Sequence, residues 1–544
     1  MGNEVQSNSR IIEESTLKEN KIKRFLEQNA VQASFIFMTS TFISRILGLG
    51  RDMLFGAYFG TSRAADALSA TLPITSIFQD VMTSAISVSL ITLFVEKYGK
   101  DRERALKDLS IIFNYIMLGL IISTFSLMIF SNQFVSILGP GFEGNYRNIV
   151  SKLVDLFSIT ALFWSITYFL FGIAQSRKHF LVTALFPLLS NTFIIISLIT
   201  FHKMLGVYSY PVGMLAGVVI QFILVIFYAK SFLGMKFTLN FNPKGTFLPA
   251  LLILSLPLIL QQLSTYSVTV VSNNLASRLQ AGSIAALGYA NKLRQLSLGI
   301  LTLPLATSYY PFLSEAAAKN DFNKLREIFS KSIRFASFFI FPAMLVSIIF
   351  ANPIVRIVFE RGAFDANAVS LTTKPFIFYS LSIFAAMVNI ITMRVFYAMK
   401  NMIIPLLISI FMSALNIAIF FPSINALQHS GIPLAISITL YIEMFILLYA
   451  LTKKTGHMNL LSIGNSLLKL LAASAIATCL MYIFYKFLEI YLSKSNLYIA
   501  INFLASTIIF IFAYLIMLVI LKADESKTAF YVIKKIVAKV KMGS

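Results

Sequence analysis

The sequence is poor in the residues on which many soluble enzymes depend. Its 544 residues include four histidines, one cysteine and one tryptophan, and 12% of them are charged, whereas soluble domains average about 25%. The single cysteine, Cys479, excludes an internal disulfide and a cysteine-based metal site. His179, His202, His429 and His457 lack the spacing of metal ligands. The composition therefore argues against a disulfide-stabilised protein and against a metalloenzyme.

Other signals of catalysis and secretion are also missing. The chain has no G-x-x-x-x-G-K-[ST] sequence, so nucleotide hydrolysis is not supported. Its polar segments are too short for a soluble catalytic domain, and no cofactor or metal is expected. The polar N-terminal segment is followed by no short apolar core with a cleavage site, so no cleavable signal peptide is evident. The function is expected to lie within the apolar segments.

Long apolar segments are what the chain does have. Apolar residues make up 57% of the sequence, and the mean hydropathy is +0.79. Windows of about 20 apolar residues, the length that crosses a bilayer as a helix, give fourteen segments: 33–50, 66–94, 109–130, 153–174, 180–201, 208–229, 248–275, 284–312, 333–350, 371–398, 402–421, 432–451, 467–488 and 498–521. The sequence therefore predicts an all-α polytopic membrane protein with 14 transmembrane helices.

The positive charge follows the order of these spans. Lys and Arg outnumber Asp and Glu by 45 to 23, which gives a net charge of +22. They concentrate in every second segment between spans and form no single basic surface for nucleic acid. Under the positive-inside rule this alternation predicts that both termini are cytoplasmic. Residues 1–32 are expected to include an interfacial helix, and residues 522–544 form a basic cytoplasmic tail.

The first predicted span carries a charged run at bilayer depth. Arg45 lies about 12 residues into the span, or roughly 18 Å at the helical rise, where ionisable groups usually face a partner, a water-filled path or a substrate. Arg45 and Asp52 share a helix face, so one interpretation is an intrahelical pair with Arg51 as an interfacial anchor. The other is a cationic site for an anionic substrate, because guanidinium groups match phosphate geometry.

A second charged cluster lies in the eighth predicted span. Tyr289, Lys292 and Gln295 fall on or near one helical face, and Arg294 lies nearly opposite Lys292. Arg294 has two equally favoured interpretations. In one it has a structural role, as a cation satisfied by a neighbouring helix, and in the other it binds the substrate.

Several short motifs in a fixed order carry a family resemblance. The first are Ser44-Arg45-Ile46-Leu47-Gly48, Arg51-Asp52, Phe59-Gly60, Ala65-Asp66-Ala67 and Leu72-Pro73. Later ones are Tyr289-Ala290-Asn291-Lys292-Leu293, Leu303-Pro304-Leu305-Ala306-Thr307, Phe359-Glu360-Arg361-Gly362-Ala363-Phe364 and Val395-Phe396-Tyr397-Ala398. In order and spacing they resemble the MurJ (MviN) lipid II flippases of the MOP exporter superfamily.

The resemblance implies both a fold and a function. It implies two six-helix lobes, 33–230 and 248–451, around a central cavity, with two C-terminal helices at 467–521 forming a groove for a lipid tail. It implies a flippase and not an enzyme. The substrate would be lipid II, an undecaprenyl-diphosphate-linked glycan that alternating access moves from the cytoplasmic to the outer leaflet of the bacterial inner membrane. Membrane lipids and cell-wall synthesis proteins are the other expected partners, and a monomer is the expected state.

The resemblance also implies a substrate site. Arg45, Arg51, Asp52 and Asp66 match family positions, and Lys292 stands where an Arg is usual. The cavity set is completed by Arg294 and by Gln295, which stands where some members have an acid. Two further departures concern the second span, which has no Arg after Leu72-Pro73, and Asn291, which stands where Asp is usual.

Polar residues inside the spans are candidates for coupling transport to a cation gradient, with the membrane potential as a second source of drive. They are Glu443, Asp80, Asn273 and Asn416. For Glu443 the favoured interpretation is a buried acid that pairs with a neighbouring helix. Membrane amides also more often tie helices together by hydrogen bonds.

Three alternatives to lipid II transport stay open. They are export of another lipid-linked oligosaccharide, a MATE-like cation-coupled antiport, and a transport-inactive scaffold role. The missing second-span Arg favours the first and the third, because it removes positive charge from one expected cavity wall.

Overall fold

The computed structural model describes residues 30–87, 89–90, 93–94, 97–98, 101–176, 180–232, 237–456, 460–491 and 495–523. All regular structure within these ranges is helical, which confirms the predicted all-α class. Their contacts divide into two units. Unit 1 contains the described residues of Met1–Phe55 and Thr71–Tyr266, and unit 2 those of Gly56–Ala70 and Ser267–Ser544.

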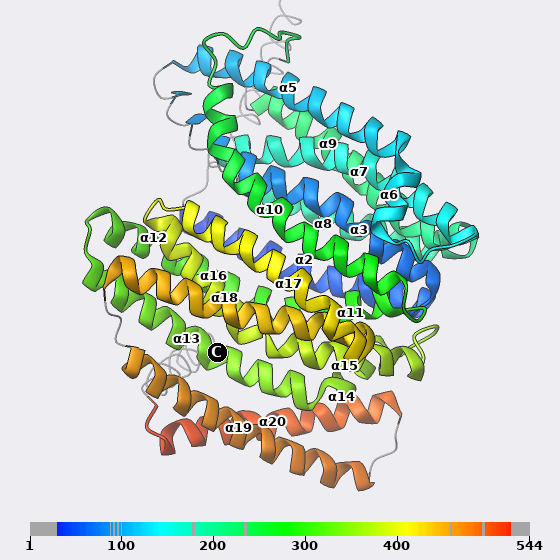
Figure 1. The fold of residues 1–544 in the computed structure, drawn as a ribbon, viewed down its shortest axis with the longest axis vertical. Coiled ribbons are helices and arrows are strands. Elements are labelled where there is room, and N and C mark those ends of the chain that lie inside the picture. The colour runs from blue at the N-terminus through cyan, green and yellow to red at the C-terminus, as the bar shows by residue number, and fades with distance from the viewer. Residues whose placement is uncertain are drawn as a thin grey trace, which may run out of the picture. The chain divides into compact units, whose positions relative to one another are not determined.

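Unit 1 is built from the helices of the first half of the chain (Figure 1). They are α2 (Ala30–Phe59), α3 (Arg63–Asp80) with its π-helical continuation Val81–Ser87, α5 (Arg102–Ile129), α6 (Ser131–Leu138), α7 (Asn145–Ser176), α8 (Phe180–Leu205), α9 (Ser209–Phe232) and α10 (Leu248–Ser277). The end of α2, the start of α3 and the end of α10 belong to unit 2.

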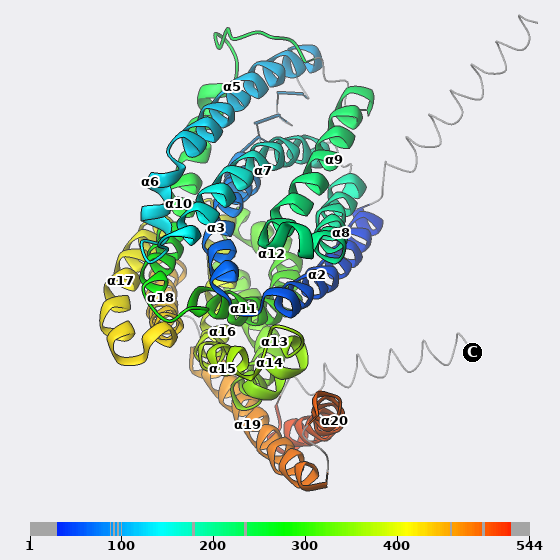
Figure 2. The same cartoon turned by 90° about the vertical axis from the view of Figure 1, so that its right-hand side faces the viewer.

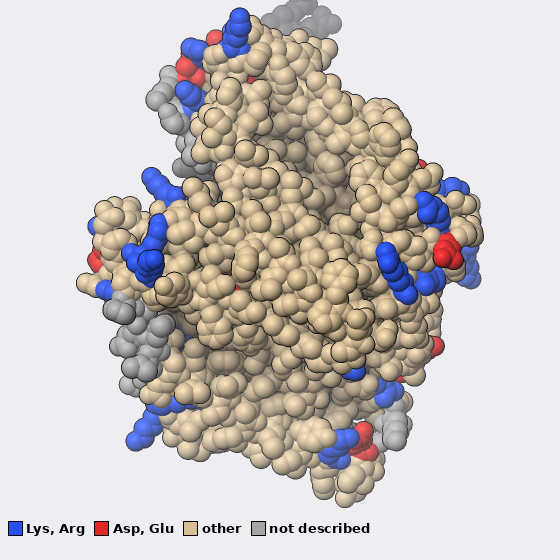
Figure 3. Space-filling view, viewed as in Figure 1, with Lys and Arg blue, Asp and Glu red and all other residues tan. Residues whose placement is uncertain are grey.

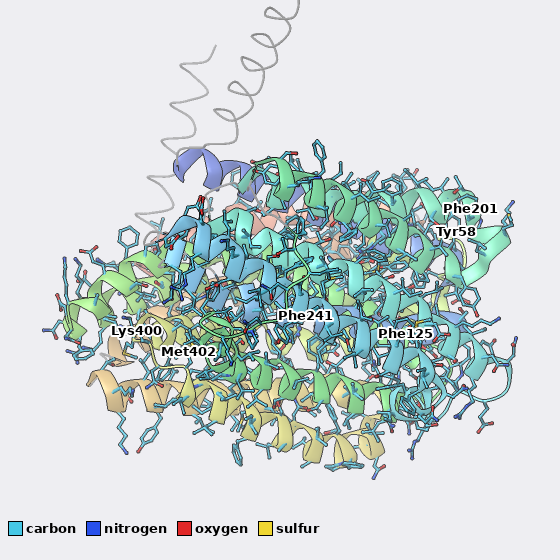
Figure 4. All side chains as sticks on the ribbon, turned by 90° about the horizontal axis from the view of Figure 1, so that it is seen from above. Tyr58, Phe125, Phe201, Phe241, Lys400 and Met402 are labelled. Atoms are coloured by element: carbon cyan, nitrogen blue, oxygen red, sulfur yellow. The ribbon has the colours of Figure 1, made fainter. Side chains whose placement is uncertain are left out.

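Within unit 1, helix α9 packs extensively on both α7 and α8. Gly213 of α9 lies so close to α8 that an added Cβ would come within 2.6 Å of the Ser197 side chain. Small residues allow such close approach between membrane helices. An extended segment after α9 lies on α5, where the Tyr115 hydroxyl donates to the carbonyl of Phe241 (2.7 Å), which is labelled in Figure 4.

Unit 2 contains the remaining helices. They are α11 (Ser283–Ser297) with a π-helical stretch Leu298–Thr302, α12 (Leu303–Ala318), α13 (Phe322–Ile349), α14 (Ala351–Phe359), α15 (Ala366–Leu381), α16 (Ile383–Ala398), α17 (Ile403–Leu427), α18 (Gly431–Thr455), α19 (Leu460–Tyr491) and α20 (Asn496–Ile520). Helices α19 and α20 pack against each other, and α19 packs on α13 (Figure 2). Lys400 and Met402 mark the turn between α16 and α17 (Figure 4).

The helices are long and apolar enough for repeated membrane crossing. Within the described ranges nine helical stretches meet that requirement, and α15 with α16, bent by 44°, brings the number to ten. Two stretches, Leu188–Ser231 and Ile403–Thr455, each join two of the helices named above. Across α17 and α18 the face drawn in Figure 3 is almost free of charged side chains. The chain is therefore a multi-pass membrane protein, and the span number of fourteen stays a prediction.

Several predicted boundaries agree closely with the helices. Segments 208–229 and 248–275 correspond to α9 and α10, and 498–521 corresponds to α20. The single predicted span 371–398 is broken at Ser382 into α15 and α16. The predicted interfacial helix within residues 1–32 and most of the basic tail lie outside the described residues.

Candidate functional site

The charged run of α2 is held by contacts inside unit 1. The guanidinium of Arg51 forms an ion pair with Asp52 (Nη2 to Oδ1, 2.9 Å) and donates to the amide oxygen of Asn191 on α8 (2.9 Å). It also lies 5.5 Å from the ring centroid of Tyr210. Asp52 thus pairs with Arg51, whereas one interpretation of the sequence paired it with Arg45. The long Arg51 side chain reaches its sequence neighbour, although successive helical residues point about 100° apart.

Arg45 lies six residues before Arg51 and differs from it in its surroundings. Its Nε atom is buried, and no hydrogen-bond acceptor for it is found within the described residues. The neighbouring Ser44 is engaged differently, because its hydroxyl and carbonyl oxygens accept from the amide of Asn191 (3.2 and 3.3 Å). A buried donor without an acceptor is unfavourable. Arg45 therefore keeps one donor atom, Nε, that no group of the described residues satisfies.

Asp80 lies in unit 1 at the end of α3. Its Oδ2 accepts a hydrogen bond from the hydroxyl of Tyr266 on α10 (2.7 Å). The adjacent Gln79 donates to the hydroxyl of Tyr168 on α7 (3.1 Å). These contacts connect α3 with α7 and α10, which is the helix-joining role that buried polar groups often have in membranes.

Asp66 caps a helix inside unit 2. Its two carboxylate oxygens accept from the backbone N–H groups of Gly282 (2.7 Å) and Ala285 (2.8 Å) at the start of α11, and its side chain is fully buried. Carboxylates stabilise helix N-termini because the first N–H groups have no helical acceptor. In this conformation Asp66 therefore acts on α11, whereas the resemblance implied a place among the substrate-binding residues.

The turn between α2 and α3 fits tightly against the segment after α14. The N–H of Ala363 donates to the carbonyl of Ala57 (2.8 Å). Gly60 and Gly362 both have positive φ, and an added Cβ would lie 2.2 Å from the oxygen of Ala363 or 2.3 Å from that of Ala57. Only glycine avoids both the strain and the clash. These two motif glycines thus join segments about 300 residues apart in sequence.

The tyrosine of the α11 motif completes the same contact. Tyr289 is buried and donates from its hydroxyl to the carbonyl of Gly60 (3.1 Å). Its ring centroid lies 4.9 Å from that of Phe359 and 5.2 Å from that of Phe364. Motifs that carried the family resemblance are therefore structural partners of one another in unit 2.

Arg294 makes three contacts inside unit 2. Its Nε donates to the amide oxygen of Asn291 (3.1 Å), and its Nη1 donates to the hydroxyl of Ser382 (3.1 Å). Its guanidinium carbon lies 5.1 Å from the ring centroid of Tyr379. These contacts favour the structural role of Arg294. They also account for Asn291, because its amide oxygen serves as the acceptor.

The Arg294 contacts reach the break between α15 and α16. At this break Ser382 donates its N–H to Tyr379, one residue closer than in a regular α-helix (3.1 Å). The carbonyls of Phe378 and Leu381 accept instead from Ser437 (2.6 Å) and Tyr441 (3.1 Å) of α18. Broken membrane helices persist where neighbouring side chains satisfy the released backbone groups.

The other two predicted cavity residues of α11 differ from Arg294. The ammonium nitrogen of Lys292 lies 5.6 Å from the ring centroid of Tyr289, and its side chain is partly buried. The structure thus brings Lys292 close to Tyr289. Gln295 differs from both, because its side chain is exposed.

The candidate coupling residues of unit 2 occupy two places. Glu443 on α18 accepts from the amide of Asn389 on α16 (3.2 Å), which supports its interpretation as an acid paired with a neighbouring helix. On the preceding turn of α18, Thr439 accepts from Asn416 of α17 (2.9 Å). Asn273 lies elsewhere and donates to the carbonyl of Ala70 in a long contact (3.5 Å).

Several contact residues were missed by the sequence analysis. They are Asn191, Tyr210, Tyr266, Ser382 and Asn389. Asn191 and Asn389 offered a signal, each as an amide within a strongly apolar segment. Within the described ranges no group of three His, Cys, Asp or Glu side chains is arranged as metal ligands.

Comparisons with known proteins agree with this fold. A family model described as lipid II flippase MurJ matches residues 55–502. A probable lipid II flippase MurJ from Rickettsia prowazekii (strain Madrid E) is 26% identical over 493 residues, covering 88% of this chain and 95% of that protein.

Solved structures give the same result. A lipid II flippase MurJ in an inward closed conformation matches with a TM-score of 0.76 and 25% identity, covering 89% of this chain and 99% of that one. An inward-facing multidrug resistance MATE family transporter of the MOP superfamily matches with a TM-score of 0.67 and 14% identity, covering 78% and 100%. The similarity to the MATE family transporter shows only that the two proteins share a fold.

Proposed function

Since the chain belongs to the MurJ family of lipid II flippases, we propose that it moves lipid II, a polyprenyl-diphosphate-linked cell-wall precursor, from the cytoplasmic to the outer leaflet. Transport proceeds by alternating access. The transported lipid is the main partner. The protein acts as a monomer without enzymatic activity of its own, with both termini in the cytoplasm.

The state of Arg45 is the observation that carries this proposal. A diphosphate offers several anionic oxygens, and guanidinium groups bind such oxygens through charge-assisted hydrogen bonds. Arg45 has a buried donor atom without an acceptor in the described structure, whereas Arg51 is already paired with Asp52. Arg45 is the primary diphosphate ligand, and Arg51 adds positive potential beside it.

Membrane potential drives the outward step in this proposal. With the inside negative, moving two negative charges across the full field is favourable by about 4.6 kcal/mol per 100 mV. Site cations that move with the diphosphate reduce this contribution. Proteoliposomes with an imposed potential measure it directly, and flipping that ignores the potential would exclude this source of drive.

The experiment for the function itself is lipid II translocation by the purified full-length protein in proteoliposomes. We expect translocation above that of protein-free vesicles, a large loss with Arg45→Ala, and no loss with Arg278→Ala. Arg278 is the matched control because it is an exposed arginine. Translocation by the wild-type protein of a different polyprenyl-linked glycan, but not of lipid II, would support the alternative substrate instead.

A further inference from the structure

Unit 2 contains a cavity that the proposed transport site does not use. It lies where α13 ends and α14 begins, against the end of α19 and the start of α20, and its volume is about 350 Å³. That volume falls within the range of small-molecule sites, about 300–1,000 Å³. Its polar lining includes Asn352, Arg356, Tyr485, Lys486, Glu489 and Asn502.

Both cations of this cavity have a carboxylate beside them. Lys486 pairs with Glu489 on α19 (2.6 Å), and Arg356 pairs with Glu360 (2.6 Å). Asn496 at the start of α20 holds the second pair in place, because its amide oxygen accepts from Arg356 (3.2 Å) and its amide nitrogen donates to the carbonyl of Glu360 (2.9 Å). A binding site with balanced charges favours a headgroup that carries both signs over a purely anionic one.

The Lys486–Glu489 pair is the one that a ligand can reach. Their side chains are 52% and 38% exposed, and exposed ion pairs are weak, so a ligand that offers both charges can replace the pair at little cost. The Arg356 and Glu360 side chains are less exposed, at 28% and 17%. We therefore expect the Arg356 side chain to stay in place when a ligand binds. The side chains of Lys486 and Glu489 are expected to separate and contact the ligand.

The surroundings of the cavity suit a membrane lipid. Tyr482 and Tyr498 line it and are partly exposed, as interfacial tyrosines are when the ring faces lipid and the hydroxyl faces water. Exposed apolar side chains stand on the same helices, among them Ile483, Phe487 and Ile490. Acyl chains of a lipid can lie on this apolar surface while its headgroup enters the polar cavity.

We propose that this cavity binds a phospholipid whose headgroup carries a phosphate and a primary amine, as in phosphatidylethanolamine. Lys486 and the tyrosine hydroxyls donate to the phosphate, and the carboxylate of Glu489 accepts from the ammonium group. A quaternary amine, as in phosphatidylcholine, has no N–H to donate to Glu489. The glycerol headgroup of phosphatidylglycerol has no cation to offer. The proposal concerns a membrane phospholipid and not the transported substrate.

Native mass spectrometry of the delipidated full-length protein tests the proposal. The probes are phosphatidylethanolamine, phosphatidylcholine and phosphatidylglycerol with the same acyl chains. We expect phosphatidylethanolamine to bind about tenfold more tightly than either of the others, the size of one charge-assisted hydrogen bond. Equal or tighter binding of phosphatidylglycerol would overturn the proposed charge complementarity.

Variants then locate the binding in this cavity. Lys486→Ala and Glu489→Gln are each expected to weaken phosphatidylethanolamine binding about tenfold, and Lys453→Ala, at an exposed lysine of α18, is expected to leave it unchanged. The double exchange Lys486→Glu with Glu489→Lys keeps both charges and is expected to retain the preference for phosphatidylethanolamine. If both single variants bound phosphatidylethanolamine as tightly as the wild-type protein, the proposed location of the binding site would be wrong.

Discussion

Arg45 and Arg294 show how differently two arginines at bilayer depth can be used. In unit 1, Arg45 retains a buried nitrogen for which the described structure provides no acceptor. In unit 2, Arg294 contacts Asn291, Ser382 and the ring of Tyr379. Burying an arginine at this depth of the membrane is unfavourable, so the side chain usually binds a ligand or makes a structural contact. The comparison indicates a ligand for Arg45 and a structural contact for Arg294.

The largest expected effect is on transport, and it comes from Arg45→Ala. We expect lipid II translocation to fall by at least about tenfold, because removing one charge-assisted hydrogen bond costs about 1.5–3 kcal/mol. Thermal unfolding is expected to occur at or slightly above the wild-type temperature, because an unsatisfied buried donor is removed. Translocation near the wild-type level would remove the distinction between the two arginines.

Arg294→Ala should produce the opposite result. We expect a loss of about 2–3 kcal/mol in stability, because Asn291 and Ser382 lose a charged donor. Arg294→Lys is expected to restore little, because an ammonium cannot reach both acceptors as a planar guanidinium does. Thermal unfolding of the purified variants measures this loss. Unchanged stability together with lost lipid binding would show that Arg294 binds a ligand, as is proposed for Arg45.

Asp66→Asn sharpens the comparison at a second predicted site residue. An amide can replace only one of the two carboxylate acceptors facing Gly282 and Ala285, so we expect a stability loss of about 1–2 kcal/mol. Asp365→Asn is the matched control, because Asp365 caps α15 through a single N–H, that of Ala368 (2.9 Å). A smaller loss for Asp66→Asn than for this control would contradict the buried cap.

The smallest effect is expected from Glu443→Gln. The amide keeps an oxygen that can accept from Asn389, so stability should change by about 0.5 kcal/mol or less. If Glu443 joins helices only, translocation and its pH dependence should stay unchanged. Loss of a pH dependence that the wild-type protein shows would instead identify Glu443 as a proton-coupling residue.

The helices could be predicted well because apolar length is a local property. Segment 248–275 agrees with α10 almost to the residue, as does 498–521 with α20. The break at Ser382 could not be predicted in the same way, since neither Gly nor Pro stands there. It depends on Ser437 and Tyr441 of another helix, whose hydroxyl groups donate hydrogen bonds to the released carbonyls.

The sequence predicted which charged residues lie within the membrane, but not which residues they contact. The depth of Arg45 and Arg294 follows from their position inside predicted apolar spans, and Arg51 directly follows the first of these spans. Their partners do not, because Asn191 follows Arg51 by 140 residues and Ser382 follows Arg294 by 88 residues. Helical periodicity indicates which residues share a face, but tertiary packing decides what that face meets.

The most direct measurement is the affinity of undecaprenyl diphosphate for the purified protein and its arginine variants. The account predicts that Arg45→Ala weakens binding by at least about tenfold, the value of one charge-assisted hydrogen bond, whereas the control Arg278→Ala binds like the wild-type protein. Equal affinity of all three proteins would contradict the central claim that Arg45 holds the diphosphate.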